Sequence, residues 1–472
     1  MVVGDFTQQV QTVIIGAGPG GYVAAIRAAQ LGQEVVLIEK ELLGGVCLNW
    51  GCIPSKAMIE VSGLKQQLQA AAKMGLIVDN LFLDMGKMHQ WKDGIVEKLR
   101  NGIASLLKQH EIDHVKGRAT IADDKTIMVD TKSGLQRFAF ENLIIATGSQ
   151  PRPLPDYPFD GEWVLNSSHA LGLTTVPENL VVVGAGSVGL EMGTIYAKLG
   201  SKVTIVEAEP DLLPGYEPEL ARVMARSLKQ LGIRLLLETK VTGMERKDNG
   251  GAVTVSGKNE ETIPADKVLV SIGRYPDTAT LGLQHLGVAT DDRGYIIVDE
   301  QMRTSAENVY AIGDLVKGPM LAHRASHMGK IAAEVISGEK AAFDNLAVPG
   351  VIFSDPEIAV AGLTEAAAKA QGIAVKSGVF PFRALGRAMT LDEVEGLTKI
   401  VSGADTGTVL GVHIIGPHAS DLIAEGALAI ESGLHYEDMS LTIHAHPTLP
   451  EGLGEAAEAI GNKAIHIFST GK

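Results

Sequence analysis

Both cysteines of the chain lie in one short glycine-rich stretch, GGVCLNWGCIPSK, residues 44–56. A thiol pair at this spacing can form a reversible disulfide, which is two-electron chemistry. On a regular helix the Cα atoms of Cys47 and Cys52 would lie roughly 8.6 Å apart, whereas a disulfide needs Cα atoms within about 7 Å. A bridge therefore needs an interrupted helix, and the glycines and the proline of this stretch supply irregular backbone.

The cysteine pair has three interpretations. A redox-active disulfide is favoured, because the charge of Lys56 and the N-terminus of the following helix would both stabilise a thiolate. Two alternatives stay open: the thiols pack as small buried hydrophobic groups, or they bind a metal. We expect no metal site, since a single CxxxxC without a second ligand pair does not complete a tetrahedral site.

A second pattern occurs twice: a buried strand, a glycine turn, a helix of small residues, and a second strand that ends in an acid. Such glycines permit a tight turn and close approach of a pyrophosphate, and the helix N-terminus binds the phosphates. The first copy comprises Gly16, Gly18, Gly21 and Glu39, and the second comprises Gly184, Gly186, Gly189 and Glu207. Each residue of the second copy follows its counterpart by 168 positions (184 − 16 for the first glycines), so we predict two dinucleotide sites.

The acid of the second copy indicates which nucleotide binds there. A carboxylate accepts hydrogen bonds from a free ribose hydroxyl and repels a 2′-phosphate. No arginine follows Glu207 in VEAEPDLLPG. The second site is therefore predicted to take NAD rather than NADP.

Near its end the chain carries two histidines and an acid in TIHAHPTLPE. A carboxylate bonded to one imidazole nitrogen orients the ring and supports its protonated form, so that the other nitrogen can move protons. A surface or packing role is the alternative for such a pair. The His446–Pro447 bond is one at which a cis peptide is allowed.

Together these motifs resemble the class I flavoprotein disulfide reductases, most of all the members that oxidise dihydrolipoamide with NAD⁺. The resemblance covers essentially the whole chain: both glycine fingerprints, CLNWGCIPSK, ATGS, the IGD at 312–314, the MLAH at 320–323 and HAHPTLPE. It implies FAD in the first site, NAD in the second, and a redox disulfide between Cys47 and Cys52. It also implies that His446 is the general acid/base with Glu451 as its partner, in a homodimer where the imidazole reaches the other subunit's disulfide. We expect His444 to be structural.

The same resemblance assigns further cofactor contacts. Lys56 would contact the flavin and pair with Glu191, an acid beside the nicotinamide. Gly117 would present its backbone to the FAD adenosine, while Asp314 and Ala322 would bind ribityl and flavin groups. From spacing alone, Asp314 has a second interpretation as the N-cap of a helix. The remaining expected cofactor-binding residues are Gly148, Val241 and Gly273.

Several other functions are less compatible with the sequence. Glutathione reductases typically carry basic residues after the second fingerprint, mercuric reductases carry extra cysteines, and a transhydrogenase of this fold would lack the cysteine pair. A non-catalytic flavin-binding subunit has no need for Cys47, Cys52, His446 and Glu451 together. The expected partners are lipoyl domains of 2-oxo acid dehydrogenase complexes and the H-protein of glycine cleavage. Trp50 and HRASHMG at 323–329 depart from the commonest family pattern, which leaves the partner contacts and the flavin potential open.

The strands and helices expected around these residues indicate an α/β fold. We predict two Rossmann-like domains and a C-terminal α+β dimerisation domain that contains an antiparallel sheet. The predicted boundaries are 1–150 for FAD binding, 151–276 for NAD binding, 277–347 for a central segment completing the FAD site, and 348–472 for the interface domain. A strand closing on Gly148 is expected within 142–149, another within 267–274, and a strand followed by Gly-Asp within 308–315; a helix is expected over 323–338. Four prolines in QPRPLPDYPFDG, residues 150–161, predict a stiff crossover that is neither helix nor strand.

Composition excludes some partners. The chain has 472 residues and a net charge of −15, and a nucleic-acid-binding face needs an excess of Lys and Arg, so no nucleic-acid partner is expected. No apolar run approaches the roughly 18 residues that span a membrane, and the N-terminus lacks the features of a signal peptide. The expected compartment is the cytosol, where structural disulfides are uncommon.

Overall fold

The computed structural model of the chain describes residues 7–247 and 250–468. They divide into two compact units. Unit 1 holds the residues up to Met58, Leu83–Arg152 and Gly273–Asp344. Unit 2 holds Ile59–Phe82, Pro153–Ile272 and the residues from Asn345 onward.

Unit 1 is built on a six-stranded sheet. β1 pairs in parallel with β2 and β5, β2 with β3, and β5 with β16, while β3, β4 and β5 form an antiparallel meander. β1 ends in the buried apolar run Val13–Ile15, as expected of a parallel strand covered on both faces. The strands are β1 (Thr7–Ile15), β2 (Val35–Glu39), β3 (Asp113–Ile121), β4 (Thr126–Thr131), β5 (Gly134–Ile145) and β16 (Val309–Ala311).

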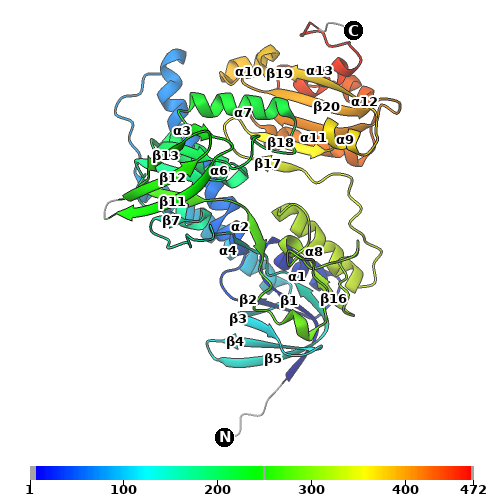
Figure 1. Cartoon of the computed structure of the whole chain (residues 1–472). Helices are drawn as coiled ribbons and strands as arrows, with labels where there is room; N and C mark the ends of the chain where they lie inside the picture. The colour runs from blue at the N-terminus through cyan, green and yellow to red at the C-terminus, as the bar shows by residue number, and fades with distance from the viewer. Residues whose placement is uncertain (1–6, 248–249, 469–472) are drawn as a thin grey trace. The chain divides into compact units, whose positions relative to one another are not determined.

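Two helices of unit 1, α1 (Pro19–Gln30) and α8 (Ala322–Ile336), lie side by side (Figure 1). Small residues allow this close contact: a Cβ on Gly329 would lie 2.5 Å from the Gly20 carbonyl oxygen. The remaining helices that begin in unit 1 are α2 (Gly45–Trp50), α3 (Cys52–Ala70, which continues into unit 2) and α4 (Met85–Gln109). The helix expected over 323–338 is confirmed as α8.

Unit 2 contains a second parallel sheet, in the order β10-β9-β8-β14-β7. Its strands are β7 (Val164–Leu165), β8 (Asn179–Val183), β9 (Lys202–Val206), β10 (Arg234–Leu236) and β14 (Lys267–Val270). A separate antiparallel sheet consists of β11 (Lys240–Lys247), β12 (Gly250–Ser256) and β13 (Glu260–Pro264). Its apolar side chains and those of the parallel sheet form one buried hydrophobic cluster. The helices of this part are α5 (Ser167–Ala170), α6 (Ser187–Leu199) and α7 (Pro218–Gln230).

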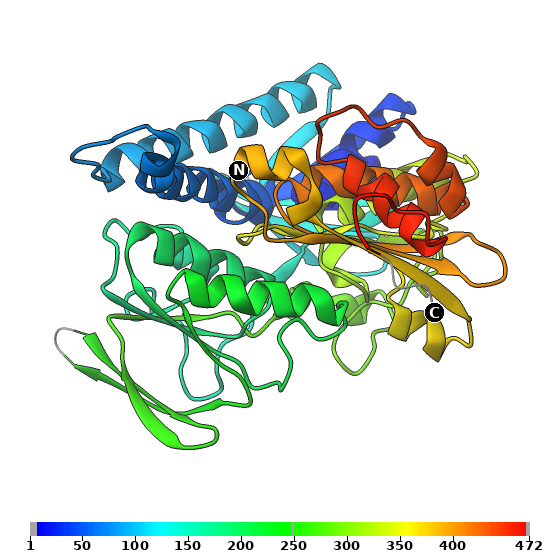
Figure 2. The same cartoon turned by 90° about the horizontal axis from the view of Figure 1, so that it is seen from above.

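The C-terminal part of unit 2 is a five-stranded antiparallel sheet, in the order β17-β18-β21-β20-β19, which confirms the predicted α+β character. The helices α11 and α13 pack against its strands (Figure 2). The strands are β17 (Gly350–Ile352), β18 (Ile358–Gly362), β19 (Val375–Pro381), β20 (Leu397–Gly403) and β21 (Val409–Ile415). The helices are α9 (Glu365–Ala370), α10 (Gly386–Leu391), α11 (Ala419–Glu431), α12 (Tyr436–Leu441) and α13 (Glu451–Ile460).

The three expected strands are present, and each ends two or three residues before a glycine. β5 ends at Ile145, β14 at Val270 and β16 at Ala311. In each case a glycine with positive φ follows within three residues and turns the chain: Gly148 at +76°, Gly273 at +105° and Gly313 at +74°.

The crossover predicted over 150–161 is partly wrong. Ser149–Pro151 forms β6, which pairs antiparallel with β15 (Arg274–Pro276). Pro151 is tolerated because a two-stranded sheet consists only of edges, where a missing N–H donor costs little.

The predicted domain boundaries stay predictions. In the described part of the chain, no helix is long and apolar enough to cross a membrane.

Candidate active site

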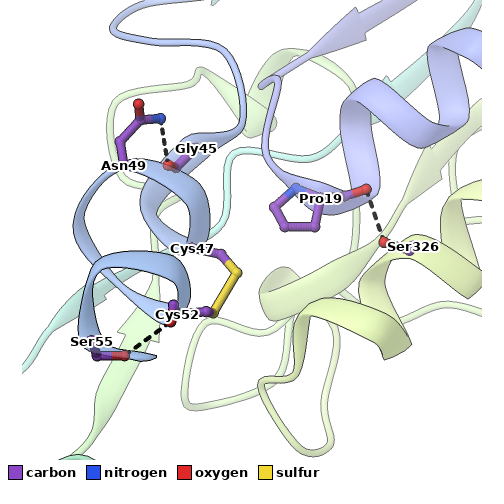
Figure 3. Close-up of a disulfide and its surroundings, with 7 residues drawn as sticks. All are labelled: Pro19, Gly45, Cys47, Asn49, Cys52, Ser55 and Ser326. Atoms are coloured by element: carbon purple, nitrogen blue, oxygen red, sulfur yellow. Dashed lines mark hydrogen bonds between the residues drawn. A yellow bond between two sulfur atoms is a disulfide. The ribbon is translucent and has the colours of Figure 1, made fainter. Parts of the chain in front are cut away.

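A break between two helices brings the cysteines together. Cys47 lies in α2, Gly51 interrupts the helix, and Cys52 is the first residue of α3. The Cα atoms of Cys47 and Cys52 are 4.6 Å apart, and the two residues form a disulfide (Figure 3). A Cβ on Gly51 would lie 3.0 Å from the Val46 carbonyl oxygen, so a larger residue would fit only with a small shift of the backbone. The predicted interruption of the helix is confirmed.

The cysteine-bearing helix is anchored to the first glycine turn. The Gly44 amide donates to the Ala17 carbonyl at 2.8 Å, and a Cβ on Gly45 would lie 2.7 Å from the Gly18 Cα. The Asn49 side chain donates to the Gly45 carbonyl at 2.9 Å and holds α2 from within (Figure 3). The disulfide is therefore fixed beside the turn at which α1 begins.

The two glycine turns have the same backbone geometry. Gly16 and Gly184 have φ of +101° and +102°. A Cβ on Gly21 would collide with the Gly16 carbonyl oxygen, and one on Gly189 with that of Gly184. These glycines are thus required by helix–strand packing.

The middle glycine of each turn has a different reason to lack a side chain. A Cβ on Gly18 or on Gly186 would meet no atom within 4 Å. Both residues have extended backbone and immediately precede a helix, whose first N–H groups are free to bind an anion. The open approach to these two turns fits the pyrophosphate groups of FAD and NAD.

The acid at the end of each unit closes its turn in the same way. Glu39 accepts the Ala17 amide at 2.7 Å and the Glu41 amide at 2.8 Å. Glu207 accepts the amides of the corresponding residues, Ala185 at 2.7 Å and Glu209 at 3.0 Å. Burial raises the pKa of Glu39, although its two backbone hydrogen bonds oppose the shift. The sequence repeat is therefore also a repeat of hydrogen bonds, and each carboxylate lies at the strand end where a ribose would be held.

The structure gives Asp314 a partner that the sequence did not indicate. The Ser149 hydroxyl donates to Asp314 Oδ2 at 2.5 Å. Ser149 is itself held by Arg274, whose Nε donates to the Ser149 hydroxyl at 2.7 Å. The alternative interpretation of Asp314 as a helix N-cap is wrong, because the N-cap of α8 is Leu321. The sequence-based predictions did not include Ser149 and Arg274 as site residues. The feature that marks them is their position, because each directly follows a glycine near a strand end.

The other predicted cofactor residues lie at turns or element ends, or within strands. In unit 1, Gly148 and Gly273 face open space, and Ala322 is the first residue of α8. Gly117 lies in β3, where a Cβ would come within 2.6 Å of the Asp130 carbonyl oxygen and the Val129 side chain.

In unit 2, Glu191 is buried in α6 and accepts the Phe353 amide at 2.9 Å, while Val241 lies in β11. The predicted pairing of Lys56 with Glu191 joins residues of different units and stays a prediction.

His446 and Glu451 are brought together as predicted. His446 Nδ1 lies 2.8 Å from Glu451 Oε1, and the Thr448 amide donates to Oε2 at 2.8 Å. Burial would raise the pKa of Glu451, but the Thr448 amide and the His446 ring outweigh it and hold the pKa below its ordinary value. The His446–Pro447 bond is cis. The ring therefore has one nitrogen engaged by a carboxylate, on a side chain that is 78% exposed.

Comparison with known proteins agrees with this geometry. Residues 10–329 match the pyridine nucleotide-disulphide oxidoreductase family, and residues 348–457 match its dimerisation domain. A dihydrolipoyl dehydrogenase of Geobacillus stearothermophilus is 48% identical over 470 residues, covering 99% of this chain and 100% of that protein. One of Bacillus subtilis is 47% identical over 469 residues, with the same coverage.

Solved structures show the same fold. LpdA from Mycobacterium tuberculosis matches with a TM-score of 0.89 at 29% identity, covering 95% of this chain and 99% of that one. The HOCl-induced flavoprotein disulfide reductase RclA from Escherichia coli matches with a TM-score of 0.84 at 28% identity and the same coverage. The predicted fold class is confirmed, and FAD and NAD are the cofactors of this family. The chain belongs to the pyridine nucleotide-disulphide oxidoreductase family, as one of its dihydrolipoyl dehydrogenases.

Proposed function

We propose that the chain oxidises protein-bound dihydrolipoamide to lipoamide with NAD⁺, and that Cys47 and Cys52 relay the electrons. The observation that carries the proposal is the position of their disulfide: it joins α2 to the first residue of α3, and the start of α2 contacts the first dinucleotide turn. The full-length similarity to dihydrolipoyl dehydrogenases supports the choice of substrate.

His446 begins the reaction by accepting a proton from one thiol of dihydrolipoamide. Its Nε2 is the atom that takes the proton, because Nδ1 is engaged by Glu451. The Glu451 carboxylate orients the ring and stabilises the charge that the proton brings. The amide of Thr448 fixes Glu451 in turn.

The sulfur steps follow thiol–disulfide exchange. The substrate thiolate attacks Cys47 Sγ and forms a mixed disulfide, while the bond to Cys52 breaks and Cys52 leaves as a thiolate. The second substrate thiol attacks the substrate sulfur of the mixed disulfide, which closes the ring of lipoamide and releases Cys47, and the departing Cys47 sulfur takes the proton of this second thiol. The substrate thus loses two electrons and two protons, and the cysteine pair gains the two electrons.

Cys52 is placed to remain a thiolate. It is the first residue of α3, where the helix dipole favours a negative charge, and Lys56 follows one turn later. When bound, FAD supplies the two-electron carrier between the reduced cysteine pair and NAD⁺. Residues of this chain that would hold FAD are Gly16, Gly18, Gly21, Glu39, Lys56, Gly117, Gly148, Asp314 and Ala322; those for NAD are Gly184, Gly186, Gly189, Glu191, Glu207, Val241 and Gly273.

The working unit in this proposal is a homodimer in which His446 of one subunit serves the disulfide of the other. The dimerisation-domain match supports the dimer. Leu441 and Ile443, just before the histidine, are 78% and 96% exposed, as expected of apolar side chains that a second subunit covers. The partners would be lipoyl domains of 2-oxo acid dehydrogenase complexes or the H-protein of glycine cleavage. The cytosolic compartment stays a prediction from the sequence.

Replacing one sulfur tests the relay. Cys52→Ser should lower dihydrolipoamide-dependent NAD⁺ reduction by more than about a thousandfold, because without Cys52 there is no disulfide for the substrate thiolate to attack, while FAD stays bound. Ser55→Ala is the matched control, since Ser55 lies in the same turn of α3 and its hydroxyl donates to the Cys52 carbonyl rather than to a sulfur. Normal turnover by Cys52→Ser would remove the cysteine relay.

A further inference from the structure

Three dipeptides of unit 1, each a glycine followed by a polar residue, lie close together in the fold. Gly148, Gly273 and Gly313 all have positive φ and are followed directly by Ser149, Arg274 and Asp314, respectively. A positive φ reverses the chain at the point where a regular strand would continue. The three polar residues come from distant parts of the sequence and are hydrogen-bonded in a row.

The hydrogen bonds of this row have a direction. Arg274 grips Ser149 with two donors: Nε to the hydroxyl oxygen and Nη2 to the carbonyl oxygen, both at 2.7 Å. Since the Ser149 hydroxyl oxygen accepts from Arg274, its own proton points to Asp314 Oδ2 at 2.5 Å. Ser149 is buried, with 5% of its surface exposed, so water does not compete for these bonds.

The row leaves one carboxylate oxygen available. Within the described residues, Ser149 is the side chain that hydrogen-bonds to the Asp314 carboxylate, and it uses Oδ2. Burial lowers the pKa of Arg274, and the negative charge of Asp314 opposes this shift. Asp314 is thus held as an acceptor with Oδ1 free for a hydroxyl-bearing ligand.

A second guanidinium fixes the segment that follows Asp314. Arg324 is buried in α8, and its Nη2 donates to the Lys317 carbonyl at 2.9 Å. Its Nη1 donates to the Pro319 carbonyl at 3.3 Å. The turn carrying Asp314 is therefore restrained on its C-terminal side by Arg324 and at its carboxylate by Arg274 through Ser149.

We infer that Arg274 is a positioning residue for FAD: through Ser149 it orients the Asp314 carboxylate toward a ribityl hydroxyl. The inference rests on the proposed role of Asp314 in the FAD site. Lysine is not equivalent to Arg274, because its single ammonium nitrogen cannot reproduce the two separate donors, Nε and Nη2, that the planar guanidinium directs at the hydroxyl and the carbonyl of Ser149.

FAD titration of the apoprotein tests the inference, with flavin fluorescence reporting binding. Arg274→Lys and Ser149→Ala should each weaken FAD binding about tenfold. Arg152→Lys is the matched control, because Arg152 directly follows β6 and, within the described residues, its guanidinium lies over the Tyr275 ring, 5.7 Å from the centroid. This control should bind FAD as the parent does.

The Asp314→Asn background separates positioning from general destabilisation. If Arg274 acts through Asp314, adding Arg274→Lys to Asp314→Asn should not weaken FAD binding further, and the visible circular dichroism of the bound flavin should be the same in both. An equal loss in both backgrounds, or parent-like binding by Arg274→Lys and Ser149→Ala, would overturn the inference while leaving Asp314 in the site. Parent-like binding by Asp314→Asn would instead refute the proposed role of Asp314. If Arg274→Lys does not fold, Ser149→Ala still tests the inference, because it removes only the hydroxyl that links Arg274 to Asp314.

Discussion

At the residue scale, two histidines two positions apart have different surroundings. The His444 side chain is 10% exposed, with Nε2 3.0 Å from Glu425 Oε1, whereas the His446 side chain is 78% exposed. The hydrogen bond to Glu425 raises the pKa of His444 despite burial. His444 therefore stabilises the fold in its charged form, and His446 is the ring that a substrate can reach.

Glu451→Gln should lower kcat/KM for dihydrolipoamide by roughly a hundredfold, the scale of one acid–base contribution. The amide keeps an oxygen for the Thr448 amide but loses the charge that stabilises the protonated His446 ring. Steady-state kinetics of NAD⁺ reduction check this outcome. Parent-like kcat/KM would show that Glu451 has no part in the proton transfer.

Glu425→Gln is the control for that variant and has its own pH dependence. It should leave turnover unchanged and lower the melting temperature. Because the folded-state pKa of His444 is raised, the stabilisation by Glu425 is fully present below the unfolded pKa of about 6.5 and is lost as pH rises through the folded value. The difference in melting temperature between parent and variant should therefore be larger at acidic than at alkaline pH.

At the element scale, a buried charge cluster joins α7, β20 and α9 within unit 2. Lys399 of β20 lies 2.8 Å from Glu217, which precedes α7, and 2.9 Å from Glu365, the first residue of α9. The side chains of Lys399 and Glu217 are 4% and 3% exposed. Solvent therefore screens their attraction little, and removal of the Lys399 cation would leave the buried Glu217 carboxylate without its ion-pair partner.

Lys399→Met should destabilise the protein by about 3 kcal/mol or more in urea unfolding. Lys369→Met is the control, because Lys369 pairs with the same Glu365 but its side chain is 63% exposed, and such pairs are worth about 1 kcal/mol or less. Equal, small effects of both changes would contradict the assignment of the cluster as a connection between elements.

The repeated strand–turn–helix units and the interrupted cysteine helix could be predicted, because the glycine spacing has a local steric cause. The roles of Ser149 and Arg274 could not be predicted, since their hydrogen bonds with Asp314 depend on three chain segments that lie far apart in the sequence. β6 was missed for a related reason: its proline pattern is local, but its pairing with β15 is not.

At the scale of the whole molecule, the two units divide the chemistry. Unit 1 holds the disulfide, the first glycine turn and Asp314, while unit 2 holds the second glycine turn and the His446–Glu451 pair. The proposed homodimer gives each disulfide a histidine from the other subunit. Electrons then pass from thiols to NAD⁺ only if the cysteine pair lies next to the flavin.

Anaerobic titration of the FAD-loaded protein with dihydrolipoamide tests that claim most directly. A long-wavelength charge-transfer absorption band should rise with the first equivalent in the parent, since it needs a thiolate against the flavin, and should be absent in Cys52→Ser. Bleaching of the flavin in the parent without such a band, or an equal band in Cys52→Ser, would contradict the account.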